Sequence, residues 1–495
     1  MANLFQKKSL SSLLTESSEG GLKRTLGAGA LIALGIGAII GAGLFVRTAA
    51  AAGEAAGPAV TLSFVVAAIG CAFAGLCYAE FAAMIPIAGS AYTYAYATMG
   101  EIVAWIIGWA LIMEYALGAA TVSIAWSEYL NNLLGGSIPY EWCHSPFETS
   151  AAGVNGIVNL PALLILFLLT LLLIKGTQES ALVNSIIVFV KVGIVLVFIA
   201  IGWGFIDSAN HTPYFIPEGT PDVLNAAGET VVSYKGFFEH GWGGVLGGAA
   251  IVFFAFIGFD AVSTAAQEAK NPSRDMPIGI LVSLLVCTFL YVLFSYVLTG
   301  VAPWTDFADP TLGKEASVAY AIQKYMTEYS WLATSITVAI LAGFSSVILV
   351  MLMGQSRVFF SMSKDGLFPK AFSDLHPKYS TPYKSNLILL VFVGAFAAFV
   401  PGSVAGDLTS FGTLFAFVIV CFGIMILRKT DPTLNRPFKT PLVPLVPILG
   451  ILVCGGMIVA LDPNTLKVAI LWMVLGLLVY FGYSRKRSVL GKKAQ

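Results

Sequence analysis

Long apolar blocks separated by short polar stretches run through most of this chain. Each block is close to the ~20 residues that a helix needs to cross the hydrocarbon core of a bilayer. The pattern predicts an all-α polytopic membrane protein with twelve transmembrane helices. The predicted spans are 28–48, 58–84, 102–127, 159–175, 183–205, 244–267, 277–300, 330–355, 385–401, 408–427, 441–461 and 466–483.

Lysine and arginine residues are unevenly distributed between the two faces that these spans define. An even number of spans puts both termini on one side; that side holds 21 of the 27 cations, and the opposite loops hold five. Because cytoplasmic loops are enriched in Lys and Arg, we expect a multi-pass plasma-membrane protein with both termini in the cytoplasm. The remaining cation, Lys191, lies inside the fifth predicted span.

The composition excludes several classes of function. Only 11% of the residues are charged, with 27 Lys+Arg against 27 Asp+Glu, whereas soluble proteins carry about 25%. This excludes a soluble globular enzyme, and the absence of a clustered basic surface argues against nucleic acid as a partner. The predicted spans contain no nucleophile with a base, no metal-ligand pair and no phosphate-binding G-x-x-x-x-G-K-[ST] loop. We therefore predict no catalytic residue, no metal site and no cofactor.

The first predicted span is rich in glycine at its centre. Gly35, Gly37, Gly41 and Gly43 fall within nine residues, and glycine is a poor helix former. The pattern favours an interrupted helix. Close helix packing is the alternative, because Gly37 and Gly41 form a GxxxG pair.

The sixth predicted span carries a second candidate break. Gly247 and Gly248 precede the aromatic run 253–259, which ends at Asp260. This arrangement is typical of a helix that stops and restarts, with Asp260 capping the amides of the second half. Two interrupted spans one five-helix unit apart predict an inverted-repeat transporter with its site near the bilayer midplane.

Interrupted helices offer free backbone groups that match a zwitterionic amino acid. We expect the substrate carboxylate on the amides of Ala42 and Gly43, where the backbone can be approached closely. The ammonium would face carbonyls of both breaks, at Ile39, Ile40, Phe253, Phe254 and Ile257. The predicted substrate-binding residues are Ile39, Ile40, Gly41, Ala42, Gly43, Phe253, Phe254, Ala255, Phe256 and Ile257. Ordinary helix packing explains the phenylalanines equally well.

Several motifs resemble those of one transporter family. They are Gly37-Ala-Ile-Ile-Gly-Ala-Gly-Leu-Phe45, Phe253-Phe-Ala-Phe-Ile-Gly-Phe-Asp-Ala-Val-Ser-Thr264, Gln267-Glu-Ala-Lys-Asn-Pro272, Met276-Pro-Ile-Gly279 and Arg357-Val-Phe-Phe-Ser-Met-Ser-Lys-Asp-Gly366. Together they resemble the amino acid–polyamine–organocation (APC) superfamily, and within it bacterial homologues of the cationic amino acid transporter (CAT) branch. The resemblance implies a LeuT-type 5+5 inverted repeat in helices 1–10, two further helices, and alternating-access transport of L-amino acids. Animal members have fourteen spans, so a cationic substrate is not assumed for this chain.

The predicted spans and the implied repeat divide the chain into seven parts. They are a cytoplasmic N-terminal segment 1–27, a first five-helix repeat 28–205, an extracellular loop 206–243, a second five-helix repeat 244–427, a cytoplasmic loop 428–440, helices 11–12 at 441–483 and a basic cytoplasmic tail 484–495.

Lys191 is the candidate proton carrier. It lies about eight residues into its span, hence roughly 12 Å deep at 1.5 Å per residue, and a buried lysine holds its proton less tightly. The resemblance implies that a lysine here replaces the sodium ion bridging helices 1 and 8 in sodium-coupled relatives. Its expected partners are carbonyls near Gly37 and the hydroxyls of Ser345 or Ser346. A lysine that snorkels to the interface is the alternative.

Three carboxylates lie in or near the spans. Glu114 falls past the middle of the third span, where it lines the substrate pocket, joins a proton path, or serves as a hydrogen-bonded structural group. Glu80 and Glu268 fall near cytoplasmic ends, where we expect them to be solvated or salt-bridged.

The sequence thus predicts a secondary transporter, most simply an L-amino acid:proton symporter. Its partners would be the amino acid, the proton and membrane lipid, and a small accessory membrane protein is left open. A proton-independent exchanger and an amino acid sensor on the same fold are the alternatives. The choice between cationic and small neutral substrates also stays open.

Overall fold

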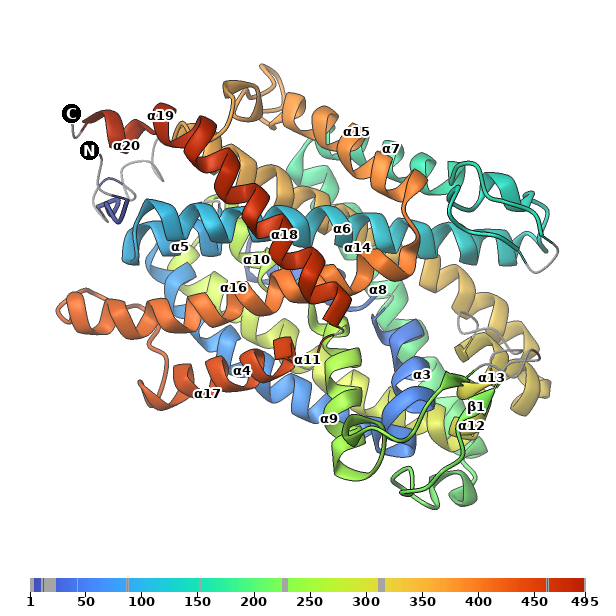
Figure 1. Cartoon of the computed structure of the whole chain (residues 1–495). Coiled ribbons are helices and arrows are strands. Elements are labelled where there is room, and N and C mark those ends of the chain that lie inside the picture. The colour runs from blue at the N-terminus through green and yellow to red at the C-terminus, as the bar shows by residue number, and fades with distance from the viewer. Residues whose placement is uncertain are drawn as a thin grey trace.

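The computed structural model describes residues 4–9, 12, 24–41, 43–85, 87, 89–150, 153–224, 230–309, 317–459, 461 and 463–493. Almost all of its regular structure is helical. The polypeptide forms one elongated helical bundle, with an extended segment of short elements at one end (Figure 1).

The first half of the bundle reaches to the end of the fifth predicted span. Its elements are α2 (Ala28–Ile39), the π-helical turn η1 (Gly43–Arg47), α3 (Thr48–Ala51), the π-helical turn η2 (Ala52–Ala56), η3 (Gly57–Ala59), α4 (Val60–Met84), α5 (Ala91–Thr98), α6 (Glu101–Leu133), η4 (Tyr140–Trp142), α7 (Leu160–Lys175), α8 (Thr177–Gly202) and η5 (Trp203–Phe205).

The following connection contains short elements. They are η6 (Ser208–His211), β1 (Val223–Leu224), β2 (Thr230–Val232) and η7 (Phe237–Glu239). The two strands pair antiparallel, with Val223 opposite Val232. Tyr234 follows β2, and its hydroxyl donates to the Gly53 carbonyl, so this connection is attached to the segment that follows the first helix.

The second half of the bundle contains the sixth to twelfth predicted spans. Its elements are α9 (Gly241–Val252), η8 (Phe253–Phe256), α10 (Ala261–Thr264), η9 (Ala266–Glu268), α11 (Pro272–Val301), α12 (Trp304–Ala308), α13 (Ser317–Tyr325), η10 (Thr327–Tyr329), α14 (Ser330–Lys364), η11 (Lys370–Phe372), α15 (Tyr383–Phe399), α16 (Gly402–Thr430), α17 (Leu445–Val459), α18 (Pro463–Val479), η12 (Tyr480–Ser484), α19 (Arg485–Arg487) and α20 (Val489–Lys493).

The long helices α6 and α14 lie at the centre of the bundle, and their apolar segments are largely buried. The helices α8, α15 and α18 lie at its periphery and expose large apolar side chains. Phe189 on α8 is 83% exposed, Val391 on α15 74% and Leu478 on α18 66%. Apolar side chains of this size on an outer surface are expected where the surrounding medium is lipid.

Both ends of the described chain meet at the start of α6. The Ile102 amide donates to the Leu4 carbonyl at 3.1 Å, and the Ser488 hydroxyl donates to the Glu101 carboxylate. Figure 1 shows α19 and α20 at this end of the bundle, whereas β1, α12 and α13 lie at the opposite end.

Among the described residues, eight helices are long and apolar enough to cross a membrane, and four shorter apolar helices accompany them. The shorter ones are Ala28–Ile39, Leu160–Lys175, Tyr383–Phe399 and Leu445–Val459. Each of the twelve predicted spans overlaps one of these helices. The protein is therefore a helical, multi-pass membrane protein, while the count of twelve crossings and the 5+5 repeat stay predictions.

Candidate functional site

The first predicted break is present in the backbone. The helix α2 ends at Ile39, Ile40 takes an extended ψ of 104°, and the chain resumes as the wide turn η1 at Gly43. The amides of Leu44 and Phe45 both point to the Gly41 carbonyl, at 3.1 and 3.4 Å. Ala42, predicted to bind the substrate carboxylate, lies outside the described residues.

The second break follows α9. The chain tightens into the 3₁₀ turn η8, and Ile257 is extended with ψ 133°. Gly258 then adopts φ +113°, and a Cβ there would lie 2.7 Å from Cβ of Ala38 in α2. This residue needs to be glycine both for its backbone conformation and for the close approach of the two broken helices.

The two breaks contact each other directly. A Cβ on Gly43 would lie 2.1 Å from Cα of Ala255. The Tyr291 hydroxyl of α11 lies 2.7 Å from the Ile39 carbonyl and 2.9 Å from the Ala255 carbonyl, so its single proton is shared between the breaks. Sequence reasoning missed Tyr291, because one tyrosine within an apolar helix carries no spacing signal.

A small cavity of about 20 Å³ lies between the breaks and the helices α6, α14 and α16. A single water needs roughly 10–15 Å³, so this conformation holds no amino acid there. Five of the predicted residues line it, namely Ile39, Gly41, Gly43, Phe254 and Ile257. Its opposite wall includes Val122, Val347 and Met351, and no charged side chain is part of its lining.

The other predicted residues that the structure describes do not line this cavity. The Phe253 ring packs against Phe417, and the Phe256 ring packs against Tyr291. Ala255 meets Gly43 at the crossing of the breaks, and Ile40 turns its carbonyl to Lys191.

A second cavity of about 370 Å³ lies next to the first and is lined by charged groups, including Arg47, Glu54 and Glu239. Phe254 lines both cavities, and the Arg47 guanidinium lies 5.5 Å from the centre of its ring. Phe254 therefore borders both the charged cavity and the apolar one.

Lys191 is fully buried on α8 and reaches the first break. Its ammonium donates to the carbonyls of Gly37 at 2.8 Å and Ile40 at 2.7 Å, and to the Ser346 hydroxyl at 3.4 Å. Of the two serines considered, Ser345 takes no part, because its hydroxyl donates to Leu341 within its own helix. The structure therefore does not support Ser345 as a partner of Lys191.

Two buried carboxylates lie on the other side of the breaks. Glu114 on α6 is fully buried, and the Thr413 side chain of α16 is a polar neighbour of its carboxylate. The neighbouring Tyr115 hydroxyl donates to Asp260 at 2.9 Å. Asp260 occupies the N-cap position of α10 but makes no side-chain capping hydrogen bond there, so the predicted capping is not confirmed.

A family model described as amino acid permease matches residues 26–483. The chain belongs to the amino acid permease family. It is 43% identical to the branched-chain amino acid permease BcaP of Bacillus subtilis, with 99% of each chain covered. It is 38% identical to the methylthioribose transporter of the same species, over 99% of this chain and 100% of that protein. It is 33% identical to the vacuolar cationic amino acid transporter 4 of Arabidopsis thaliana, over 87% of this chain and 68% of that protein.

This amino acid permease is therefore a membrane transporter and not an enzyme. The family match confirms the predicted resemblance to the APC superfamily. The similarity to a cationic amino acid transporter agrees with the CAT-like motifs found in the sequence. Among the described residues no group of three or more His, Cys, Asp or Glu side chains is arranged to hold a metal ion.

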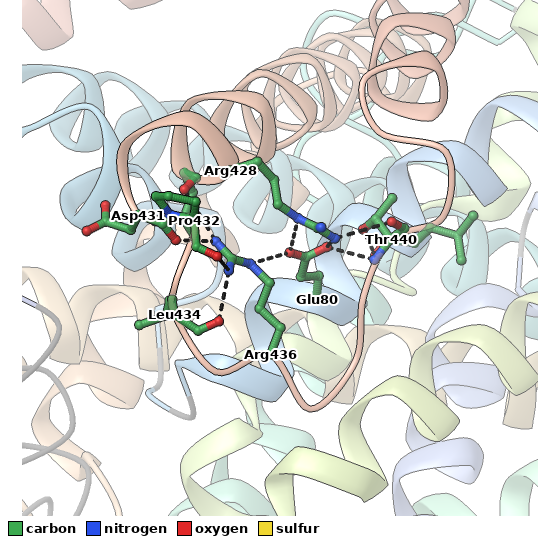
Figure 2. Close-up of polar contacts among 9 residues, drawn as sticks. Glu80, Arg428, Asp431, Pro432, Leu434, Arg436 and Thr440 are labelled. Carbon is green, nitrogen blue, oxygen red and sulfur yellow. Dashed lines mark hydrogen bonds and ion pairs between the residues drawn. The ribbon is translucent and has the colours of Figure 1, made fainter.

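Two carboxylates of the permease near helix ends are ion-paired, one of the two outcomes expected from sequence. Glu80 at the end of α4 is fully buried and accepts two hydrogen bonds from Arg428 of α16, at 2.9 and 2.8 Å. Arg436 lies 3.1 Å away on the other side, and the Thr440 amide donates at 2.7 Å. Figure 2 shows Glu80 between the two guanidinium groups, which attach the loop after α16 to α4.

The second pair joins η9 to α14. Arg357 places Nε and one terminal nitrogen 2.7 Å from the same Glu268 oxygen, and both side chains are almost fully buried. Next to it, the Leu26 amide donates to the Glu268 carbonyl and the Lys270 amide to the Leu26 carbonyl, at 3.0 and 2.8 Å. These bonds connect the segment before α2, the turn η9 and the helix α14.

Proposed function

We propose that this permease is a proton-coupled secondary transporter of L-amino acids with aliphatic side chains. It would act in the plasma membrane with both termini in the cytoplasm, as the uneven distribution of Lys and Arg supports. The two five-helix repeats, 28–205 and 244–427, would alternate access to a site between the broken helices.

Backbone groups would bind the parts that all amino acids share. The α-carboxylate would meet the amides around Gly43, and the ammonium would meet carbonyls of the two breaks. Support comes from Gly41 and Gly43, which both line the small cavity between the breaks.

The side chain of the substrate would occupy the apolar wall. Val122, Val347 and Met351 offer dispersion contacts and no counter-charge, so a lysine or arginine substrate would leave its cation without a partner. The similarity over the full length to a branched-chain amino acid permease supports the same preference. We therefore propose leucine, isoleucine and valine as substrates.

The observation that carries the coupling is the position of Lys191. An ammonium has three N–H groups, and three acceptors surround it: two carbonyls of the first break and one hydroxyl of α14. A neutral amine donates one bond fewer, so release of the proton would loosen the first break from α8 and α14. Glu114, a fully buried carboxylate on α6, is a second candidate for the proton path.

The test uses purified protein in proteoliposomes. Lys191→Ala should abolish accumulation of radiolabelled leucine driven by an inward proton gradient, and Lys235→Ala, in the connection between α8 and α9, should leave it intact. Gradient-driven accumulation by Lys191→Ala equal to that of the wild type would refute the proton coupling. Leucine exchange without accumulation in the wild type would indicate an exchanger, and binding without uptake would indicate a sensor.

Competition by unlabelled solutes tests the substrate. Leucine, isoleucine and valine should inhibit uptake most strongly, and arginine weakly. Methylthioribose belongs in the panel, because one relative over the full length transports it by name. That compound has neither a carboxylate nor an ammonium group, so strong competition by it would argue against the proposed backbone contacts.

A further inference from the structure

A buried chain of hydrogen bonds runs from Lys191 away from the cavity. The Lys191 ammonium lies 3.4 Å from the Ser346 hydroxyl, which lies 2.6 Å from the carbonyl oxygen of the Asn184 side chain. The Asn184 amide nitrogen then donates to the Ala33 carbonyl of α2 at 3.0 Å. All three side chains are at most 1% exposed. The chain thus connects α8 and α14 to α2.

The direction of this chain follows from counting donors and acceptors. The Ala33 carbonyl can only accept, so the Asn184 amide nitrogen faces it and the Asn184 oxygen faces Ser346. The hydroxyl of Ser346 has one proton and two acceptors within reach, the Asn184 oxygen at 2.6 Å and the Gly37 carbonyl at 3.0 Å, so the shorter contact is the one to Asn184. When it accepts a bond from a charged Lys191, it can give that proton to Asn184. With Lys191 charged, every group in the chain has a partner.

The same count changes when Lys191 is neutral. The amine then has two N–H groups and a lone pair that needs a donor. Ser346 is the hydroxyl in contact with it, and turning its proton to the lysine takes that proton away from Asn184. The oxygen of Asn184 would be left buried without its donor, which is costly in an apolar interior. The charge on Lys191 therefore decides whether Asn184 links α14 to α2.

Gly37 of α2 packs closely against both Asn184 and Ser346. A Cβ on Gly37 would lie 2.5 Å from the Asn184 oxygen and 2.8 Å from the Ser346 hydroxyl. Asn184 precedes Lys191 by seven residues, two turns of α8, so both face the first helix from the same side. Asn184 therefore contacts the turn of α2 that immediately precedes the break.

We propose that Asn184 is a positioning residue for proton coupling, which transmits the charge state of Lys191 through Ser346 to α2. This inference rests on the proposed function, because it assumes that Lys191 exchanges a proton during transport. Groups facing Lys191 are carbonyls from α2, the Ser346 hydroxyl from α14 and, from α11, the Cys287 thiol, the titratable neighbour among the described residues.

The variants are Asn184→Ala, Ser346→Ala and the double substitution, with Ser185→Ala as the control. Ser185 is adjacent, and its hydroxyl donates to Ala181 within α8. Gradient-driven leucine accumulation should fall about tenfold in Asn184→Ala, the effect of one hydrogen bond in a charged network. The dependence of this accumulation on external pH should flatten, while the leucine affinity of Asn184→Ala stays within about twofold of the wild type. Accumulation by the Ser185→Ala control should also stay within about twofold of the wild type.

The double variant separates a shared chain from two independent effects. If Asn184 acts through Ser346, the double loss equals the larger single loss, whereas multiplied losses would overturn the proposal. Unchanged accumulation and pH dependence in Asn184→Ala would also overturn it. If Asn184→Ala does not fold, Ser346→Ala tests the same hydrogen-bond chain from α14. Leucine accumulation by Ser346→Ala with the same pH dependence as the wild type would then refute the inference. If leucine accumulation by the wild type does not depend on the proton gradient, the proposed function itself is refuted.

Discussion

The closest approach of the two breaks can be tested by adding one methyl group. Gly43→Ala places a Cβ 2.1 Å from Cα, 2.6 Å from Cβ and 2.7 Å from the amide nitrogen of Ala255. Two of these atoms are backbone, so no side-chain rotation relieves the overlap. One of the two broken helices has to move.

The size of that movement sets the expected effect. The Cβ falls short of the ordinary contact of 3.4 Å by about 1.3 Å, so the breaks must separate by roughly that distance. Overpacking of this kind costs about 1–3 kcal/mol, which a protein in its membrane can survive. A displacement of about 1 Å among groups that hold a substrate costs on the order of a hundredfold in rate. We expect a folded protein with leucine uptake reduced about a hundredfold.

The assay compares initial rates of uptake in proteoliposomes with thermal midpoints in detergent. Gly29→Ala is the matched control, because it lies on the same helix α2 and its Cβ would meet no atom within 4 Å. It should transport within about twofold of the wild type, since alanine is the better helix former. Normal transport by a folded Gly43→Ala protein would refute the view that the two breaks form the site together.

Two further substitutions test the substrate selectivity and the ion pairs of Glu80. Met351→Ala shortens a side chain in the apolar wall and so enlarges the central cavity. Inhibition of leucine uptake by phenylalanine, relative to inhibition by valine, should therefore increase about tenfold or more. An unchanged order of competitors would contradict the proposed role of this wall. Glu80→Gln leaves Arg428 and Arg436 without their shared carboxylate and should lower stability by about 3 kcal/mol. Its thermal midpoint should fall below that of the exposed-loop control Glu218→Gln, and equal midpoints would contradict the expectation.

The positions of the helices were largely predictable because the length of each apolar block can be counted directly in the sequence. The breaks were predictable for a related reason. Glycine weakens a helix, and the structure ends α2 at Ile39 and α9 at Val252, within the predicted segments, although α9 keeps Gly247 and Gly248 in helical conformation. The helix ends were less predictable. The eighth predicted span ends at residue 355, whereas α14 continues to Lys364, because a helix can extend past the apolar stretch into polar surroundings.

The short strands and the side-chain partners were not predictable. Strands of two and three residues, as in β1 and β2, have no measurable periodicity. Asp260 was expected to cap its own helix, but the Tyr115 hydroxyl from α6 binds it. Adjacent serines on a helix point about 100° apart, so sequence alone could not choose between Ser345 and Ser346. Asn184 went unnoticed because its partners come from two other helices.

The carbonyls of the first break connect these observations. Those predicted for the substrate ammonium already have partners in this conformation: Ile40 accepts from Lys191, and Ile39 accepts from Tyr291. A carbonyl oxygen has two lone pairs, so a substrate ammonium can bind beside Lys191 but would share its acceptor. On the proposed function, substrate and proton then act on the same few backbone atoms. Coupling between substrate and proton would then need no long pathway. Whichever of the two binds first would change the position and electrostatic environment of the carbonyl that the other contacts.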